Sequence, residues 1–338
     1  MLHRFSKVVV ASTILLLLAG SLVTSTGSGL SVPDWPTTYG WNMFTFPPSK
    51  WVGGIFYEHG HRLIASTVGF LTIILAAWLW IAESRRWMKW LGVAALGSVI
   101  LQGVLGGLTV LFFLPTTISS AHAGLAEIFF CTTVAIALFT SPSWLAAPSS
   151  VDDGMLRRVA TWTTAVIYAQ IIVGAVMRHS DAGLAIPDFP WMFGHVIPDH
   201  WDPKIAVHFA HRVGALVVTL SVLATSAHIW YHHRGRHELT RPAALIVSLV
   251  AAQVTLGALT VLSQRDVWIN SVHLVCGALV LATSIVVTLR SWQVRITEKV
   301  RLKPDTTTVV RPVRLTTSAK ATVVKKVDTT TANQGSRA

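Results

Sequence analysis

Apolar residues fill most of this chain in long runs, and short polar segments separate the runs. Eight runs are long enough for a membrane helix, which needs about 20 residues to cross the hydrocarbon core. They lie roughly at 7–26, 58–82, 89–113, 118–140, 158–178, 206–230, 242–263 and 269–290. The pattern predicts an all-α integral membrane protein with eight transmembrane helices.

The charge distribution predicts how these helices are oriented. Only 12% of the 338 residues are charged, whereas a soluble domain carries about a quarter. The net charge of +12 comes from Lys and Arg in short connections and in the tail, which argues against a nucleic-acid partner. Basic connections alternate with poorly charged ones, so we expect a multi-pass protein of the cell membrane. Both termini are expected in the cytoplasm, with the loops 27–57 and 179–205 outside.

The sequence also predicts the state of the two chain ends and of the two cysteines. The start has a basic segment and an apolar run, like a signal peptide, but the run Val8–Val23 is long for one and belongs to a repeat, so we expect a retained helix. Residues 293–338 are rich in Thr and Lys and are predicted to be a disordered, basic cytoplasmic tail. Cys131 and Cys276 lie in apolar runs and are expected to be buried and free of a disulfide.

An internal repeat divides the chain. GLSVPDWPTTYG at 29–40 matches GLAIPDFPWMFG at 183–194, and QGVLGGLTVL at 102–111 matches QVTLGALTVL at 253–262. Near-constant spacing means that whole four-helix units correspond, as two pseudo-symmetric bundles that run in the same direction through the membrane. The predicted parts are an N-terminal half at 1–142, a cytoplasmic linker at 143–156 and a C-terminal half at 157–292.

Four of the 14 histidines occupy repeat-equivalent positions near the outer ends of helices: His61, His122, His211 and His273. Two histidines on neighbouring helices at equal depth can ligate haem iron from both sides. Zinc is less suited, because no third or fourth ligand is evident. His59 lies about 200° around its helix from His61 and is set aside. Two sites at one depth favour exchange between them over conduction across the membrane.

Charged residues accompany the first histidine of each pair. Glu58 lies three positions before His61, on the same helix face, so we expect it near the rim of a bound macrocycle. The equivalent residue of the other half is His208. Arg62 and Arg212 follow the candidate ligands and are candidate partners for haem propionates. The alternative is an arginine that only reaches the membrane interface.

Other polar residues are given structural roles. Asp34 and Asp188 lie in the Gly- and Pro-containing outer loops and are expected to form turns. Glu127 is a second membrane carboxylate, for which packing or hydrogen bonding suffices. The glycines of GVLGGL, Gly103, Gly106 and Gly107, allow close helix approach and receive no chemical role.

Taken together, these features resemble the haem A synthase family over roughly residues 5–292. They include the eight helices, the Glu58…His61-Arg62 pattern, the GLSVPDWP loop and the other three histidines. The resemblance implies that haem O, the substrate, binds between His61 and His122, and that a haem b cofactor binds between the other pair. It also implies oxidation of the C8 methyl of haem O to a formyl group by two hydroxylations, with a catalytic role for Glu58. The implied partner is haem O synthase, a farnesyltransferase that supplies the substrate. Membrane lipid is expected as a further partner, since the basic tail can contact anionic lipid.

The sequence leaves several points open. Some family members carry a cysteine pair in the first outer loop and this chain has none there, so the electron acceptor is undetermined. The oxygen donor and the oligomeric state, a homo-oligomer included, are also undetermined. The main alternative is a non-catalytic di-haem b-type membrane cytochrome, which needs the four histidines but not Glu58. A transporter would explain the repeat but predicts no haem.

Overall fold

The protein is an all-helical membrane protein in the computed structural model, which describes residues 1–146 and 153–301. Eight helices are long and apolar enough to cross a membrane, which confirms the predicted fold class. They are α1 (Leu2–Ser25), α2 (Gly54–Ala82), α3 (Arg86–Leu111), α4 (Thr116–Phe139), α6 (Gly154–His179), α7 (Pro203–His232), α8 (His237–Leu262) and α9 (Val267–Arg301). Three short elements are η1 (Met43–Thr45), η2 (Pro48–Lys50) and α5 (Pro142–Leu145).

Two helices, α6 and α7, begin before their apolar runs at an aspartate cap. Asp202 accepts a hydrogen bond from the N–H of Ile205 at 2.8 Å, and Pro203 takes the first helical position, so α7 begins at 203 and not at 206. Asp153 caps α6 in the same way. The last helix continues to Arg301, beyond the predicted end at 290. Most of the predicted tail lies outside the described residues.

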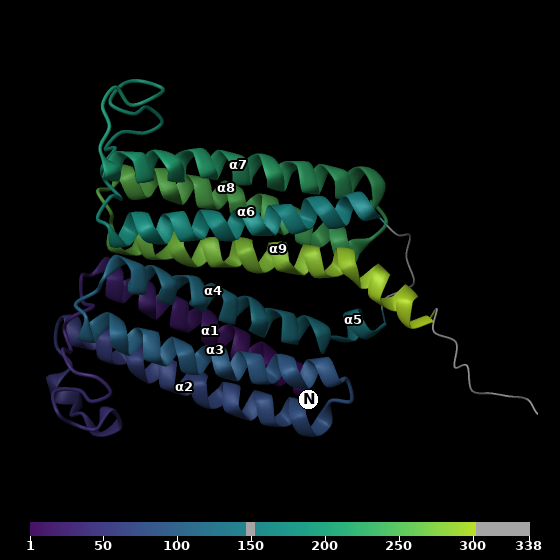
Figure 1. The fold of residues 1–338 in the computed structure, drawn as a ribbon, viewed down its shortest axis with the longest axis horizontal. Coiled ribbons are helices and arrows are strands. Elements are labelled where there is room, and N and C mark those ends of the chain that lie inside the picture. The colour runs from purple at the N-terminus through teal and green to yellow at the C-terminus, as the bar shows by residue number, and fades with distance from the viewer. Residues whose placement is uncertain (147–152, 302–338) are drawn as a thin grey trace, which may run out of the picture. The chain divides into compact units, whose positions relative to one another are not determined.

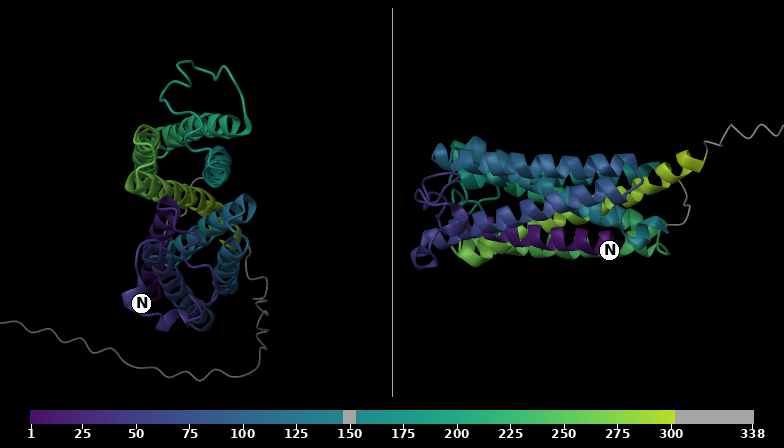
Figure 2. Two further views of the ribbon diagram at one scale, coloured as in Figure 1. Left: turned by 90° about the vertical axis from the view of Figure 1, so that its left-hand side faces the viewer. Right: turned by 90° about the horizontal axis from the view of Figure 1, so that it is seen from below.

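The helices α1–α4 lie beside one another, and so do α6–α9; we call these two groups the first and second halves (Figures 1 and 2). Residues Met1–Glu298 form one compact unit, so the division into halves remains a prediction from the repeat. The two long loops, 26–53 and 180–202, lie at the same end of the helices, and the N-terminus lies at the other end (Figure 1).

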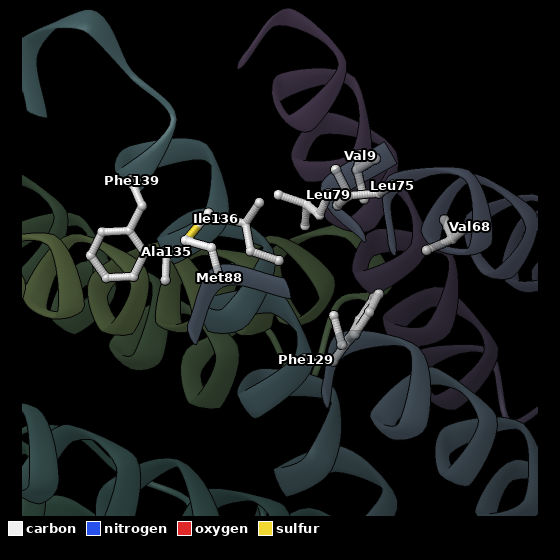
Figure 3. Close-up of a cluster of buried hydrophobic side chains, with 10 residues drawn as sticks. Val9, Val68, Leu75, Leu79, Met88, Phe129, Ala135, Ile136 and Phe139 are labelled. Atoms are coloured by element: carbon white, nitrogen blue, oxygen red, sulfur yellow. The ribbon is translucent and has the colours of Figure 1, made fainter. Parts of the chain in front are cut away.

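Buried apolar side chains hold each half together. In the first half, Val9, Leu75, Met88 and Ile136 pack from α1, α2, α3 and α4 into one cluster (Figure 3). In the second half a cluster around Ile167 and Val222 also includes Cys131 of α4. Both cysteines are buried and free, as predicted. Large apolar side chains elsewhere, such as Ile81, remain exposed, as expected where a helix faces lipid.

The two long loops share one turn. Asp34 accepts hydrogen bonds from the N–H groups of Tyr39 and Gly40, at 2.7 and 2.9 Å. Its counterpart Asp188 accepts from Phe193 and Gly194, both at 2.9 Å. Both glycines have φ near +75° (Gly40 at 75°, Gly194 at 79°), a conformation that glycine adopts without strain. The predicted turn-forming role of the two aspartates is confirmed.

The Asp188→Ala variant should loosen the second outer loop. It removes a carboxylate that accepts one backbone hydrogen bond at each oxygen. Hydrogen bonds to a charged group are stronger than those between neutral groups. We expect protease added to the detergent-purified protein to cut within 180–202 about threefold faster or more. Asp199→Ala is the matched control, because Asp199 lies in the same loop and its exposed carboxylate pairs with the exposed side chain of His200. Equal cleavage of both variants would contradict the role of the turn.

Acid should loosen the same turn. Burial raises the pKa of Asp188, but the N–H groups of Gly194 and Phe193 outweigh this and hold the pKa below its ordinary value of 3.8. The turn is therefore fully stabilised above about pH 3.8, and the stabilisation is lost as the pH falls through the lower pKa of the folded state. Loop cleavage by an acid-active protease should rise below this pH in the wild type and change little in Asp188→Ala.

Candidate functional site

Four histidine-bearing helices bring their imidazoles into two pairs near the end that carries the long loops. His61 of α2 and His122 of α4 are close enough to interact electrostatically. His211 of α7 and His273 of α9 do the same in the second half. All four side chains are half-buried. Each half thus contains the pair that the repeat predicts, on two different helices.

Each of these imidazoles lies against a glycine of the preceding helix. A Cβ placed on Gly20 would be 3.0 Å from Cε1 of His61, and one on Gly174 would be 2.9 Å from Cε1 of His211. The same relation joins Gly106 to His122 at 3.2 Å and Gly257 to His273 at 3.1 Å. A methyl group at any of these positions would require the ring to move. The absence of a side chain therefore makes room for each imidazole beside the helix backbone.

Most of the Nδ1 atoms of these rings lack a partner. Nδ1 is buried without a hydrogen bond in His61, His122 and His273. In His211 it lies 2.9 Å from the side-chain Nε2 of Gln170, which also donates to the carbonyl of His211 at 2.7 Å. Gln170 thus fixes the orientation of its ring. Leu16 occupies the equivalent position in the first half, and its apolar side chain can hydrogen-bond neither to the ring nor to the carbonyl of His61.

This arrangement suits a planar metal complex ligated from two sides. Neutral imidazoles on facing helices are the usual axial ligands of haem held in a helix bundle. A zinc site would need further ligands. Among the described residues, the one group of three or more potential ligands within reach of one another lies elsewhere, at Asp153. Each histidine pair is therefore able to hold one haem between its two imidazoles.

Glu58 is buried, and its two oxygens have separate partners. Oε1 forms an ion pair with Arg62 at 2.6 Å, and Oε2 accepts from the N–H of Val32 at 2.9 Å. Our sequence-based expectation placed this carboxylate toward a macrocycle rim. In the structure it also holds the first outer loop to the start of α2. The carboxylate lies one helical turn from His61, on the side where the loop covers the helix.

His208 takes the place of Glu58 in the second half. Its Nδ1 accepts a hydrogen bond from the N–H of Ile186 at 3.2 Å. Ile186 is the repeat equivalent of Val32. The two halves therefore share one loop tether, and only the first half builds it with a carboxylate.

Arg62 and Arg212, which we expected to bind haem propionates, hydrogen-bond to the two long loops in this structure. Arg62 donates to the carbonyls of Val32, Asp34 and Thr37, at 2.9, 2.8 and 3.0 Å. Arg212 donates to three carbonyls of the second loop, those of Ile186, Asp188 and Trp191. Each guanidinium thus fastens a loop over the helix that carries the histidine. Binding of a propionate by either arginine remains a prediction.

His59 has no part in either pair. Its ring is fully buried among loop side chains, with Trp51 and Phe46 centred 4.7 and 5.1 Å away and the Thr38 hydroxyl 3.2 Å from Nδ1. This environment suits a histidine that packs the loop onto α2. Glu127, the other membrane carboxylate, is also buried, and its Oε2 has no partner among the described residues.

Sequence reasoning missed Arg178, which joins the two halves. It lies in the last turn of α6 and donates to the carbonyl of Ser21 and the hydroxyl of Ser25 in α1, at 3.1 and 2.9 Å. It also reaches Asn270 of α9 at 3.4 Å. One signal could have revealed it: the repeat places Thr24 at the equivalent position, so an arginine occurs here in one half only.

Comparison with known proteins decides the family. The model of the COX15-CtaA family, described as a cytochrome oxidase assembly protein, matches residues 49–285. The chain belongs to the haem A synthase family. The haem A synthase of Symbiobacterium thermophilum is 32% identical over 281 residues, which are 78% of this chain and 87% of that protein. That of Alkalihalophilus pseudofirmus is 31% identical over 283 residues, 80% of this chain and 91% of that protein.

The haem A synthase family match includes every residue of the two histidine pairs. Glu58 and both arginines of the loop tethers also lie within residues 49–285. The segment before residue 49, with Gly20 and the first Asp34 turn, precedes the match. In the structure this segment nevertheless makes the same contacts as its counterpart in the second half.

Substitution of a glycine that supports a histidine should release bound haem. In Gly257→Leu the new side chain displaces the ring of His273, and overpacking of this kind costs about 1–3 kcal/mol. We expect about tenfold less haem per purified chain, measured from the Soret absorbance and total protein. Gly103→Leu is the control, because Gly103 is also helical and has open space where a Cβ would be. Equal haem content in the two variants would contradict the supporting role.

Proposed function

We propose that this chain is an enzyme that oxidises the C8 methyl group of haem O to a formyl group, through a hydroxymethyl intermediate, and so makes haem A for the assembly of terminal oxidases. The observation that carries this proposal is the buried carboxylate of Glu58, one helical turn from His61. The second half keeps the loop tether with His208 and lacks the carboxylate. The curated relatives named above are haem A synthases.

Haem O is the proposed substrate, held between His61 and His122. The unpartnered Nδ1 atoms and the glycines beside both rings support this position. Leu16 leaves His61 without the amide contact that His211 has, and a less constrained ring suits a ligand that must enter and leave. Arg62 is the candidate propionate partner here, and a propionate would compete with the loop carbonyls for its N–H groups.

Haem b is the proposed cofactor, held between His211 and His273. Gln170 fixes the ring of His211, and contacts of this kind hold metal ligands in position. A permanently bound group benefits most from such support. Arg212 is the candidate propionate partner in this half. When bound, haem b would supply one-electron transfer.

The reaction requires a group that takes up protons. With water as the oxygen donor, each hydroxylation of the methyl group releases two protons and two electrons. The second gives a gem-diol, which loses water to leave the formyl group. Glu58 can accept a proton at Oε2 if the contact with the N–H of Val32 is given up, while Oε1 stays with Arg62. The negative charge can also stabilise positive charge that develops on the substrate.

The proposed location is the cell membrane, with both termini in the cytoplasm. The basic connections support this orientation, since Lys and Arg are enriched in cytoplasmic segments. Haem O synthase is the proposed neighbour, because its farnesylated product is too apolar to travel through water. The electron acceptor would approach from the end of the helices where both histidine pairs lie.

The Glu58→Gln variant tests the proposal. Glutamine keeps the size of the side chain and an oxygen for the N–H of Val32 but removes the charge. In cells that also make haem O, we expect haem A to fall about 100-fold or more, the usual contribution of a positioned acid or base. The haem content of the purified variant should stay unchanged.

The matched control is His208→Gln, which changes the equivalent tether of the other half. This variant should still make haem A, because the proposed reaction does not use His208. Undiminished haem A from Glu58→Gln would overturn the role of Glu58. Haem O without haem A or a hydroxylated intermediate in cells with the wild-type chain would overturn the enzyme itself.

A further inference from the structure

A cluster of three side chains of metal-ligating types lies at the other end of the second half, where α6 begins and α7 ends, 17 residues beyond His211 along α7. Nε2 of His228 and Nε2 of His233 each lie 2.8 Å from the same oxygen, Oδ2 of Asp153. The three donor atoms lie within 4.8 Å of one another. All three side chains are partly buried, with 19%, 9% and 21% of His228, His233 and Asp153 exposed.

The backbone fixes the carboxylate in this cluster. Oδ1 of Asp153 accepts from the N–H of Leu156 at 2.9 Å and so caps α6. This leaves Oδ2 directed toward the two imidazoles. The hydrogen bond at Oδ1 restrains the whole carboxylate and so keeps Oδ2 in place, and support of this kind is typical of metal-binding carboxylates.

The end of α7 brings the two rings together. Residues five apart in a continuous helix point about 140° away from each other. His233 lies just after the last residue of α7, with φ −132° and ψ 33°, so its ring turns back toward that of His228. The ring centroids are 6.2 Å apart. The two rings therefore meet only because the helix ends before His233. The spacing of His228 and His233 in the sequence does not predict this contact.

We propose that Asp153, His228 and His233 bind a divalent transition-metal ion of the zinc class. Two imidazoles and one carboxylate are a common ligand set for such an ion, with water at the fourth position. Ligand atoms around tetrahedral zinc are about 3.3 Å apart, so the present contacts need to open only slightly. Calcium and magnesium prefer oxygen ligands and suit the two imidazoles poorly.

The proposed ion would fasten the start of α6 to the end of α7. These are the first two helices of the half proposed to hold haem b, and α7 carries His211. The ion would thus act as a structural clamp at the end of the helices opposite the haem. It is independent of the reaction proposed for Glu58, and it requires no residue of either outer histidine pair.

Zinc binding to the full-length protein tests this site. Detergent-purified protein is treated with EDTA, which leaves haem iron in place, and is then dialysed against a series of Zn²⁺ concentrations. We expect about one zinc per chain, counted by metal analysis apart from iron. His233→Ala and Asp153→Asn should each bind zinc at least tenfold more weakly, and asparagine can still cap α6.

The matched control is His237→Ala, which removes an exposed histidine four residues beyond His233 that lies outside the cluster. It should bind zinc like the wild type. The haem spectrum shows that each variant is folded, and zinc should raise the unfolding temperature of the wild type and the control only. Absence of zinc binding by the wild type, or equal binding by folded His233→Ala, would overturn the proposal and leave Asp153 as a hydrogen-bonded helix cap.

Discussion

The contact between an imidazole and a glycine of the preceding helix is the constraint on which both histidine pairs and the loops that cover them depend. It occurs four times, with 2.9–3.2 Å between each ring and the position that a Cβ would take. Such a contact sets both the depth and the rotation of a histidine-bearing helix against its neighbour. It therefore determines where a planar ligand can bind, and the internal repeat places two such sites side by side.

The outer loops build a second layer on this frame, and there the halves diverge. Each loop has an aspartate-centred turn and is fastened by an arginine to the helix that carries a histidine. The tether three residues before that histidine is Glu58 in one half and His208 in the other. The structural task is the same, so the difference in charge calls for a functional reason. Gln170 adds a second asymmetry, since it steadies only His211.

Much of this could be predicted from sequence, and the failures have physical causes. Apolar runs predicted the eight helices, and the Gly- and Pro-containing loop motif predicted the aspartate turns, because both depend on local sequence. The contact of Glu58 with the N–H of Val32 could not be predicted from sequence, because Val32 reaches the carboxylate only when the loop folds back over α2. The GVLGGL motif predicts close helix approach at Gly106, but it does not show that the neighbour is the ring of His122. The repeat shows that Arg178 has no arginine counterpart in the first half, but its contacts with α1 and α9 could not be predicted from the sequence.

The central claim is that the two histidine pairs are separate sites, one for a resident cofactor and one for an exchanging substrate. It is tested most directly by the haem content of two variants, His122→Ala and His273→Ala, purified from cells that make haem b but no haem O. The account predicts that His122→Ala keeps about as much low-spin haem b per chain as the wild type, whereas His273→Ala loses most of it. Loss of haem b from His122→Ala with full retention by His273→Ala would contradict it.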